Sequence, residues 1–294
     1  MSWVALIGAA GAWGVATAVA KYAVRGIGPV TTLLVETAVA ALVLGGAHIA
    51  RRRPRQVPLW RYALLGLLEP GVAYGALDLG LRSTPAANAA PLDGLQAAFV
   101  LVLGLVFCGQ RISRRAAAGV TVATIGVAVV TAVHATLAVG AGDALVLTGS
   151  LAASGSVLVA SRLADRADSL ELTAYQFGFG LAWIAPVSMV LYLTRSTPTP
   201  TGHDLRYLIG AATLGLGAFS LAYLLYNYAV GEVPVDVAGI ALNLIPLFGV
   251  AAAYTMLHER LYTSQLLGGL LILAGVIVFS TRTESSLTPE APSQ

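Results

Sequence analysis

Long apolar stretches follow one another along nearly the whole chain. Each has about the 20 residues that an α-helix needs to cross a bilayer. Only 11% of the residues are charged, whereas a soluble domain carries about 25%, so most side chains do not face water. The pattern predicts an all-α, polytopic membrane protein with ten transmembrane helices. The spans are expected at residues 2–23, 29–50, 60–81, 84–108, 115–135, 142–163, 170–194, 205–230, 233–257 and 263–281.

Turn-forming and charged residues separate these spans. Gly28-Pro29 precedes the second span, and the arginine-rich segment 51–55 follows it, as expected for a connection outside the apolar region. The segment 283–294 is polar and contains two prolines, and it is predicted to be a disordered tail.

The distribution of positive charge predicts the orientation. Cytoplasmic loops of membrane proteins carry an excess of Lys and Arg. If the N-terminus is cytoplasmic, most of the 17 Lys and Arg residues fall in inside loops, the segment 51–55 among them. We therefore expect a multi-pass protein of the cell (cytoplasmic) membrane with both termini in the cytoplasm.

An internal repeat is the most informative feature of the order of residues. Residues 65–131 match residues 214–280 without a gap, at a constant offset of 149 positions. The matched pairs include Tyr74 with Tyr223, Asp78 with Asn227, Pro85 with Pro234, Phe99 with Phe248, and Gly126 with Gly275. Apolar sequences match easily by chance, but Pro, Tyr and Gly at one constant offset do not.

The repeat unit contains five spans, and five is an odd number. The second copy therefore enters the membrane from the opposite side, which gives the inverted repeat found in many secondary transporters. We assign residues 1–138 to the first copy and residues 139–282 to the second. Two oppositely inserted copies can exchange conformations, and a binding site is then expected near the midplane between them.

Several residues resemble the EamA-type transporters of the drug/metabolite transporter superfamily. The first span reads Ala12-Trp13-Gly14, and each half closes on a Gly-Glu-Arg-Leu-like signature, 109–112 and 258–261. The first signature departs from the family with Gln110 in place of Glu, and the second with His258 in place of Gly. The resemblance implies ten helices, cytoplasmic termini, a central cavity, and export of amino acids, other metabolites or toxic compounds.

Three acidic residues are expected deep in the membrane. Glu69 and Asp93 lie near the middle of their spans, and Glu36 lies about two turns into the second span. An ionisable residue at such depth is expected to face a cavity or a partner. With no Lys or Arg predicted at matching depth, the acids suit proton coupling or a substrate ammonium group. The alternative is a structural carboxyl group hydrogen-bonded to a neighbouring helix.

Polar and aromatic residues near these acids are the other candidates for the site. Tyr74 shares a helix face with Asp78, four residues on, and their repeat partners are Tyr223 and Asn227. Asp78 could instead pair with Arg82, and the tyrosines could be interfacial anchors. The complete candidate set for substrate binding is Glu69, Asp93, Tyr74, Gln96, Tyr223, Tyr226, Asn227 and Trp13, and the candidates for coupling are Glu69, Asp93 and Glu36.

Proline and glycine residues near Glu69 predict local features of the backbone and of helix packing. Pro70 removes one helical hydrogen bond directly after Glu69 and so predicts a broken helix, which is tolerated at that depth where it lines a cavity or is packed by protein. Gly71 and Gly75 form a G-x-x-x-G face that favours a close helix crossing. Lys21, near the end of its span, is expected to be solvated.

Motifs that the sequence lacks exclude several classes of function. There is no Walker loop, so the energy is expected from a gradient, an exchanged solute or a partner. The single cysteine and scattered histidines predict neither a disulfide nor a metal site, and no cofactor or nucleic-acid partner is expected. Gly140 to Asp143 fits the G-x-G-D pattern of intramembrane aspartyl proteases, but the Tyr-Asp pair that such proteases need occurs nowhere.

We therefore hypothesise that the chain is not an enzyme but a secondary transporter that exports a small metabolite, such as an amino acid, by alternating access. Efflux of lipophilic cations or drugs is the alternative within transport. An intramembrane enzyme and a non-transporting membrane subunit are the rivals from other classes. A homodimer is left open.

Overall fold

The computed structural model describes residues 2–51, 57–108, 114–131, 140–163, 166–195, 204–230 and 244–280. These residues form helices joined by short connections, and they contain no strand. The predicted all-α class is confirmed. The predicted tail 283–294 lies outside the described residues, as does Gln110.

The helices are described by the two predicted repeat copies. The first half holds α1 (Ser2–Arg51), α2 (Leu59–Gly66), η1 (Leu67–Val72), α3 (Ala73–Gly80), α4 (Ala86–Asp93), α5 (Gln96–Cys108) and α6 (Arg114–Thr131). The second half holds α7 (Ala141–Leu163), α8 (Ser169–Leu193), α9 (Leu205–Leu214), η4 (Gly215–Leu221), α10 (Ala222–Val230), α12 (Ile245–Leu257) and α13 (Thr263–Ser280).

The first helix contains two of the predicted spans. It has 50 residues, about 75 Å at 1.5 Å per residue, which far exceeds one bilayer core of about 30 Å. Gly28 interrupts it with φ 75° and ψ 164°, a backbone conformation that a residue with a Cβ atom rarely adopts. Pro29 follows and cannot donate a backbone hydrogen bond. The chain therefore reverses direction here, as the Gly-Pro pair predicts.

Five of the described helical stretches are long and apolar enough to cross a membrane, and two shorter stretches are also apolar. The five are Val4–Arg51, Ala86–Gly104, Ala141–Ala160, Ser169–Leu193 and Leu205–Tyr226, and the shorter two are Ile245–Leu257 and Thr263–Gly275. The count of ten crossings stays a prediction.

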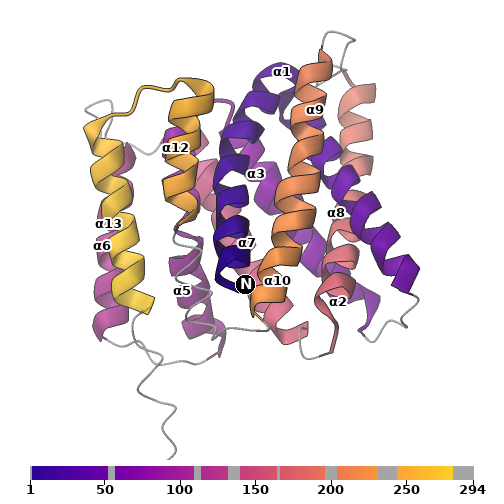
Figure 1. Ribbon diagram of the computed structural model, residues 1–294, viewed down its shortest axis with the longest axis horizontal. Coiled ribbons are helices and arrows are strands. Elements are labelled where there is room, and N and C mark those ends of the chain that lie inside the picture. Colours follow the sequence, from indigo (N-terminus) through magenta and orange to yellow (C-terminus); the bar gives the residue numbers. More distant parts are fainter. Residues whose placement is uncertain are drawn as a thin grey trace, which may run out of the picture.

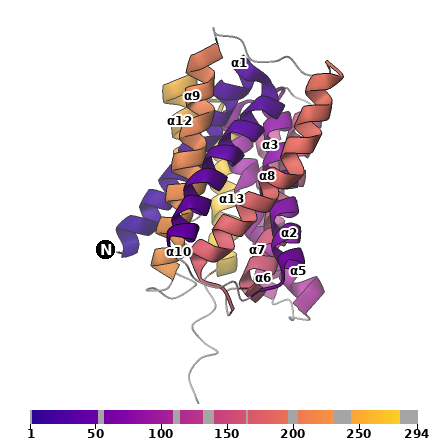
Figure 2. The same cartoon turned by 90° about the vertical axis from the view of Figure 1, so that its right-hand side faces the viewer.

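The repeat is visible in the helix boundaries. Shifting α5 and α6 by the offset of 149 reproduces the bounds of α12 and α13 residue for residue. The copies run in opposite directions, because α2 lies at the lower end of the bundle and α3 above it, whereas α9 lies at the upper end and α10 below (Figure 1). The same order holds in the perpendicular view (Figure 2).

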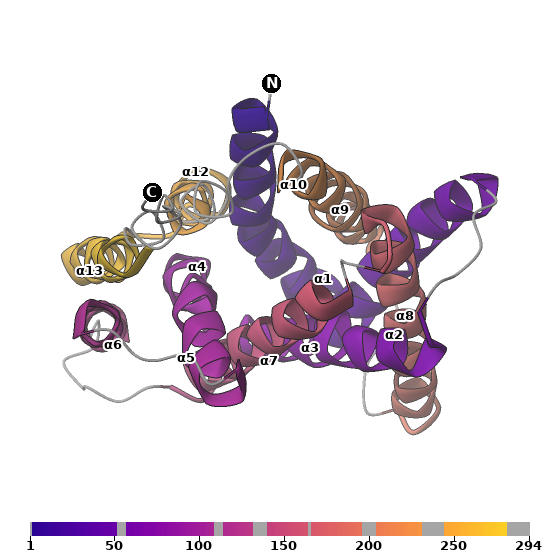
Figure 3. The same ribbon diagram turned by 90° about the horizontal axis from the view of Figure 1, so that it is seen from below.

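The end-on view shows how the halves share the bundle. Helices α6 and α13, which correspond in the repeat, lie together at one edge, and α2 and α8 lie at the opposite edge (Figure 3). A Cβ atom on Gly126 of α6 would lie 2.7 Å from the carbonyl oxygen of Gly268 in α13. The two backbones approach closely because glycine leaves the space.

Other glycines bring α3 against α7, and they differ from the predicted ones. A Cβ atom on Gly149 of α7 would lie 2.6 Å from the carbonyl oxygen of Ala73 in α3. At Gly75, by contrast, a Cβ atom would make an ordinary 3.5 Å contact with Leu33, and at Gly71 it would meet only atoms of its own helical segment. The close crossing predicted for the G-x-x-x-G face is therefore wrong.

Candidate functional site

The helix of the third predicted span is interrupted where the sequence predicts it. Between α2 and α3, the π-helical segment η1 contains Glu69 with the extended backbone angles φ −149° and ψ 117°, followed by Pro70. Proline has no N–H, so the helical ladder is broken at this point. The interruption turns the carbonyl and side chain of Glu69 toward the second half of the protein.

Three side chains of the second half bind the buried carboxyl group of Glu69, which is 6% exposed. Tyr223 of α10 donates its hydroxyl to Oε1 at 2.9 Å, and Ser156 of α7 donates to Oε2. Gln176 of α8 donates from Nε2 to the Glu69 carbonyl oxygen at 3.1 Å and lies 3.5 Å from Oε2. Both oxygens of the carboxyl group are thus held between the two halves.

Aromatic rings surround this carboxyl group. The ring of Trp13 meets the rings of Tyr223 and Tyr226 edge to face, with centroids 5.2 and 5.4 Å apart. Phe177 lies against Tyr223 at 5.5 Å. The Tyr74 hydroxyl lies close enough to interact with both Glu69 and Tyr223. The structure therefore brings together five of the sequence candidates, Glu69, Tyr74, Tyr223, Tyr226 and Trp13.

Asp93 lies at the neighbouring end of α4, where it is half-buried and interacts electrostatically with Glu69. Ser150 of α7 donates its hydroxyl to Oδ1 of Asp93 at 2.9 Å. The helix stops at Asp93, and Gln96 begins α5 after a two-residue turn. Asp93 and Gln96 are three residues apart, but they do not lie on one continuous helix. The Gln96 carbonyl oxygen accepts a hydrogen bond from Ser154 at 3.0 Å.

Glu36 and Asp78 form a second pair of buried acids, each only 1% exposed. They come from α1 and α3 and interact electrostatically. Oε1 of Glu36 and Oδ2 of Asp78 have no hydrogen-bond partner among the described residues. Arg82 is exposed at the end of α3 and forms no ion pair with Asp78. The local Asp78–Arg82 pair that sequence spacing allows is therefore wrong.

Lys21 is not solvated, which corrects another expectation. Its side chain is 5% exposed, and its ammonium group donates to the carbonyl oxygens of Leu81 and Thr84 in the connection between α3 and α4. Leu81 is the C-terminal cap of α3, where a carbonyl oxygen has no partner within the helix, and Thr84 lies in the connection itself. The ammonium group of Lys21 thus binds the backbone that follows α3. It is therefore not available to pair with Glu36 and Asp78.

The second-half family signature contributes a contact between the halves at the same end of the bundle. Glu259 accepts hydrogen bonds from the backbone N–H groups of Ala86 and Ala87 at 3.2 and 3.0 Å, the unpaired donors at the start of α4. It also pairs with Arg25 of α1 at 3.3 Å. Glu259 therefore ties together two helices of the first half from a loop of the second.

Asp143, the aspartate of the G-x-G-D pattern, also has a local structural role. Its Oδ2 accepts a hydrogen bond from the backbone N–H of Gly140 at 3.2 Å, and its Oδ1 accepts one from the Thr84 hydroxyl at 3.0 Å. An acidic residue in the first turn of a helix stabilises the helix N-terminus. These contacts account for Asp143 without a reaction.

Sequence reasoning missed the donors that hold the acids: Ser150, Ser156 and Gln176. Ser150 and Ser154 are four residues apart in an apolar span, a spacing that places both hydroxyl groups on one helix face. That pattern could have identified α7 as the helix facing the acids. Asn227 lies in α10, but its side chain is not among those that the structure describes.

Sequence comparisons and a structure comparison relate this chain to known proteins. Two successive segments, residues 1–132 and 140–281, match the EamA-like transporter family. An uncharacterized transporter of Archaeoglobus fulgidus is 25% identical over 276 residues, which cover 94% of this chain and 97% of the relative. A probable terminal-alkyne amino-acid exporter of Streptantibioticus cattleyicolor is 26% identical over 270 residues, which cover 89% of this chain and 86% of the relative.

A solved crystal structure has the same fold, with a TM-score of 0.64, over 93% of this chain and 94% of that chain, at 18% sequence identity. The double family match agrees with the duplicated helix boundaries, and the apolar helices agree with a multi-pass membrane transporter. The resemblance inferred from the sequence is confirmed. The chain belongs to the EamA-like transporter family.

Proposed function

We propose that this transporter exports a small zwitterionic metabolite, such as an amino acid, across the cytoplasmic membrane by alternating access. The observation that carries the proposal is the buried carboxyl group of Glu69, held by donors from the opposite half of the protein. A site held by both halves is remade whenever the halves rearrange, which is the requirement for alternating access.

The chemistry of the site suits an ammonium group. Glu69 and Asp93 supply acceptor oxygens, and the buried cation of α1, Lys21, is bound to backbone carbonyl oxygens instead. The faces of Trp13, Tyr223 and Tyr226 add an aromatic environment, and aromatic faces attract cations. The amino-acid exporter of Streptantibioticus cattleyicolor is a relative with a matching named substrate class.

Proton exchange at the acids is the proposed source of energy. Glu69, Asp93 and Glu36 can each hold a proton or release it, and a substrate ammonium that binds a carboxylate displaces that proton. Exchange of the two across the membrane couples export to a proton gradient. Both termini are placed in the cytoplasm under this proposal.

The second candidate is efflux of lipophilic cations, which the aromatic rings around Glu69 favour. A cation without a carboxylate would use the same acid and the same rings. The two functions differ in whether free amino acids compete with such a cation for transport.

The test is transport by the purified protein in liposomes under an imposed pH gradient, with a panel of amino acids and lipophilic cations. We expect Glu69→Gln and Asp93→Asn each to lower transport at least tenfold, because a hydrogen bond to a charged group contributes about 1.5–3 kcal/mol.

The matched control is Glu171→Gln. Glu171, at the start of α8, is also buried, but it accepts a hydrogen bond from Tyr62 of α2 rather than from the donors of Glu69 or Asp93. Transport by Glu69→Gln and Asp93→Asn at the wild-type rate would overturn the site assignment. No flux of any solute in wild-type liposomes would overturn the transport mechanism.

A further inference from the structure

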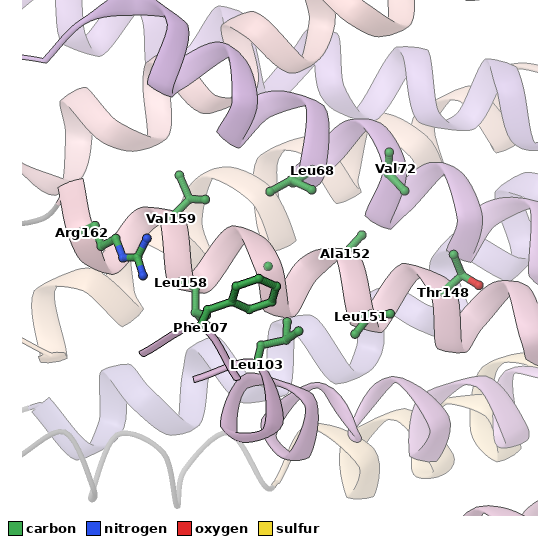
Figure 4. Close-up of a pocket in the computed structure, with 11 residues that line it drawn as sticks. Leu68, Val72, Leu103, Phe107, Thr148, Leu151, Ala152, Leu158, Val159 and Arg162 are labelled. Atoms are coloured by element: carbon green, nitrogen blue, oxygen red, sulfur yellow. The ribbon is translucent and has the colours of Figure 1, made fainter. Parts of the chain in front are cut away.

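A pocket on the outer surface of the bundle is separate from the acidic site. It has a volume of about 520 Å³ and lies between η1, α5 and α7 (Figure 4). Its lining includes Leu68 and Val72 of η1, Leu103 and Phe107 of α5, and one face of α7 from Thr148 to Arg162. None of the candidate site residues lines it.

The pocket faces the surroundings of the protein rather than its core. Phe107 is 68% exposed, Leu151 is 45% exposed and Val72 is 41% exposed. Large apolar side chains exposed together mark a surface for another apolar molecule. For a helix that crosses a bilayer, that surrounding molecule is a lipid.

The α7 face is apolar along its length and charged at one end only. Its residues recur at helical spacing from Thr148 to Arg162. This span covers about 21 Å at 1.5 Å per residue, more than the depth of one leaflet of a hydrocarbon core about 30 Å thick. An acyl chain therefore fits along the face, with its headgroup at the Arg162 end.

We propose that this groove binds one anionic phospholipid, with an acyl chain along α7 and the phosphate at the guanidinium group of Arg162. Guanidinium groups bind phosphate oxygens through two parallel hydrogen bonds, which favours Arg162 as the headgroup contact. Arginine near the surface also attracts anionic lipids over neutral ones. The basic end of the groove and its apolar wall thus both favour an anionic phospholipid.

The bound lipid contacts the reverse side of the segments that hold Glu69. Leu68, in the groove wall, precedes Glu69 directly, and Gly155 lies between Ser154 and Ser156. A Cβ atom on Gly155 would lie 3.7 Å from Leu68. Occupancy of the groove therefore supports the turn of η1 and the turn of α7 that meet at the carboxyl group.

The test is native mass spectrometry of the purified, delipidated protein titrated with phosphatidylglycerol and, separately, phosphatidylcholine. We expect phosphatidylglycerol to bind more tightly. Arg162→Gln should weaken phosphatidylglycerol binding about fivefold, the size of one lost cationic contact at a lipid surface. Phosphatidylcholine binding should fall less, because the choline ammonium group already offsets the charge of its phosphate. Arg162→Lys should retain most of the preference.

Two further variants distinguish lipid binding in this groove from attraction by general surface charge. Gly155→Leu places a side chain beside Leu68 in the groove and should weaken both lipids. Arg166→Gln removes an exposed charge at the same end of α7 that does not line the groove, and it should change neither. Equal wild-type affinity for the two lipids would overturn the proposal, as would equal losses in Arg166→Gln and Arg162→Gln.

Discussion

The two π-helical segments of this transporter occupy equivalent places in its two halves but carry different chemistry. Leu67–Val72 of the first half corresponds, at the offset of 149, to 216–221 of the second, and η4 covers Gly215–Leu221. Glu69 of the first segment corresponds to Ala218 of the second. Asp93, likewise, corresponds to Leu242. A π-helical segment is retained at this place in both halves, whereas these two acids occur in the first half alone.

In each half, a backbone carbonyl oxygen of the π-helical segment accepts a hydrogen bond from a side chain of the other half. The carbonyl oxygen of Glu69 accepts from Gln176 of the second half at 3.1 Å. The carbonyl oxygen of Ala218 accepts from Nε1 of Trp13 of the first half at 2.8 Å. In the apolar region no water satisfies such a group. The comparison indicates that both π-helical segments contact the opposite half, and that the binding role proposed for Glu69 belongs to one copy only.

The largest expected effect comes from making the first segment resemble the second. We predict that Glu69→Ala lowers transport in liposomes at least tenfold, because it removes the carboxyl group that three donors surround. Ala218→Ser adds a small polar group at the equivalent place in the second half, and it should leave transport within twofold. Equal losses in the two variants would show that the asymmetry between the halves has no functional meaning.

Removing the donors that complete the backbone should separate stability from transport. Gln176→Leu and Trp13→Phe each remove a side-chain hydrogen bond to a backbone carbonyl oxygen, which costs about 0.5–1.5 kcal/mol. We expect comparable falls in the thermal unfolding midpoint in detergent. Transport should fall much further in Gln176→Leu, because Gln176 also approaches the Glu69 carboxyl group. If Trp13→Phe lowers transport as strongly as Gln176→Leu does, the proposed difference between the two halves is wrong.

The closing signatures of the two halves provide a smaller contrast, since only the second retains a glutamate. Glu259→Ala removes the acceptor for two N–H groups at the start of α4, a contact of the kind worth about 0.5–2 kcal/mol. We predict about tenfold faster hydrogen–deuterium exchange in α4. Arg25→Gln should change that exchange less than twofold, because Arg25 is 51% exposed and exposed ion pairs contribute little. Equal exchange rates would contradict the assigned role of Glu259.

The smallest expected effect comes from Ser150, the donor to Asp93, whose counterpart in the second half is apolar. Ser150→Ala removes one hydrogen bond to the Asp93 carboxyl group, so we predict transport about fivefold lower, equivalent to about 1 kcal/mol. Ser154→Ala is the matched control, because its hydroxyl donates to the backbone carbonyls of Gln96 and Ser150. A larger transport loss in Ser154→Ala would argue against a role for Asp93.

Much of the fold follows from local sequence signals. The apolar stretches predict the helices, Gly28-Pro29 predicts the reversal within α1, and Pro70 predicts the interruption beside Glu69. The constant offset predicts the duplicated helix bounds. These features depend on the length of apolar segments and on the conformations open to Gly and Pro, which neighbouring residues in the chain largely decide.

The contacts of the site could not be derived in the same way. Sequence spacing suggested an Asp78–Arg82 pair, whereas the structure buries Asp78 beside Glu36 and exposes Arg82. Nor did the sequence indicate that Ser156 and Gln176 would contact Glu69. Residues of α7, α8 and η1 are far apart in the chain, so their meeting depends on how the helices pack.

The sequence by itself therefore determined a duplicated helical membrane protein with acids in its first half and a broken helix beside one of them. Only the tertiary structure decided which side chains meet those acids and which glycines allow the helices to approach. The physical reason is that nearly every face of these helices is apolar, so hydrophobicity alone does not specify which faces meet. Close approach at Gly149 and the donors from the other half specify them instead.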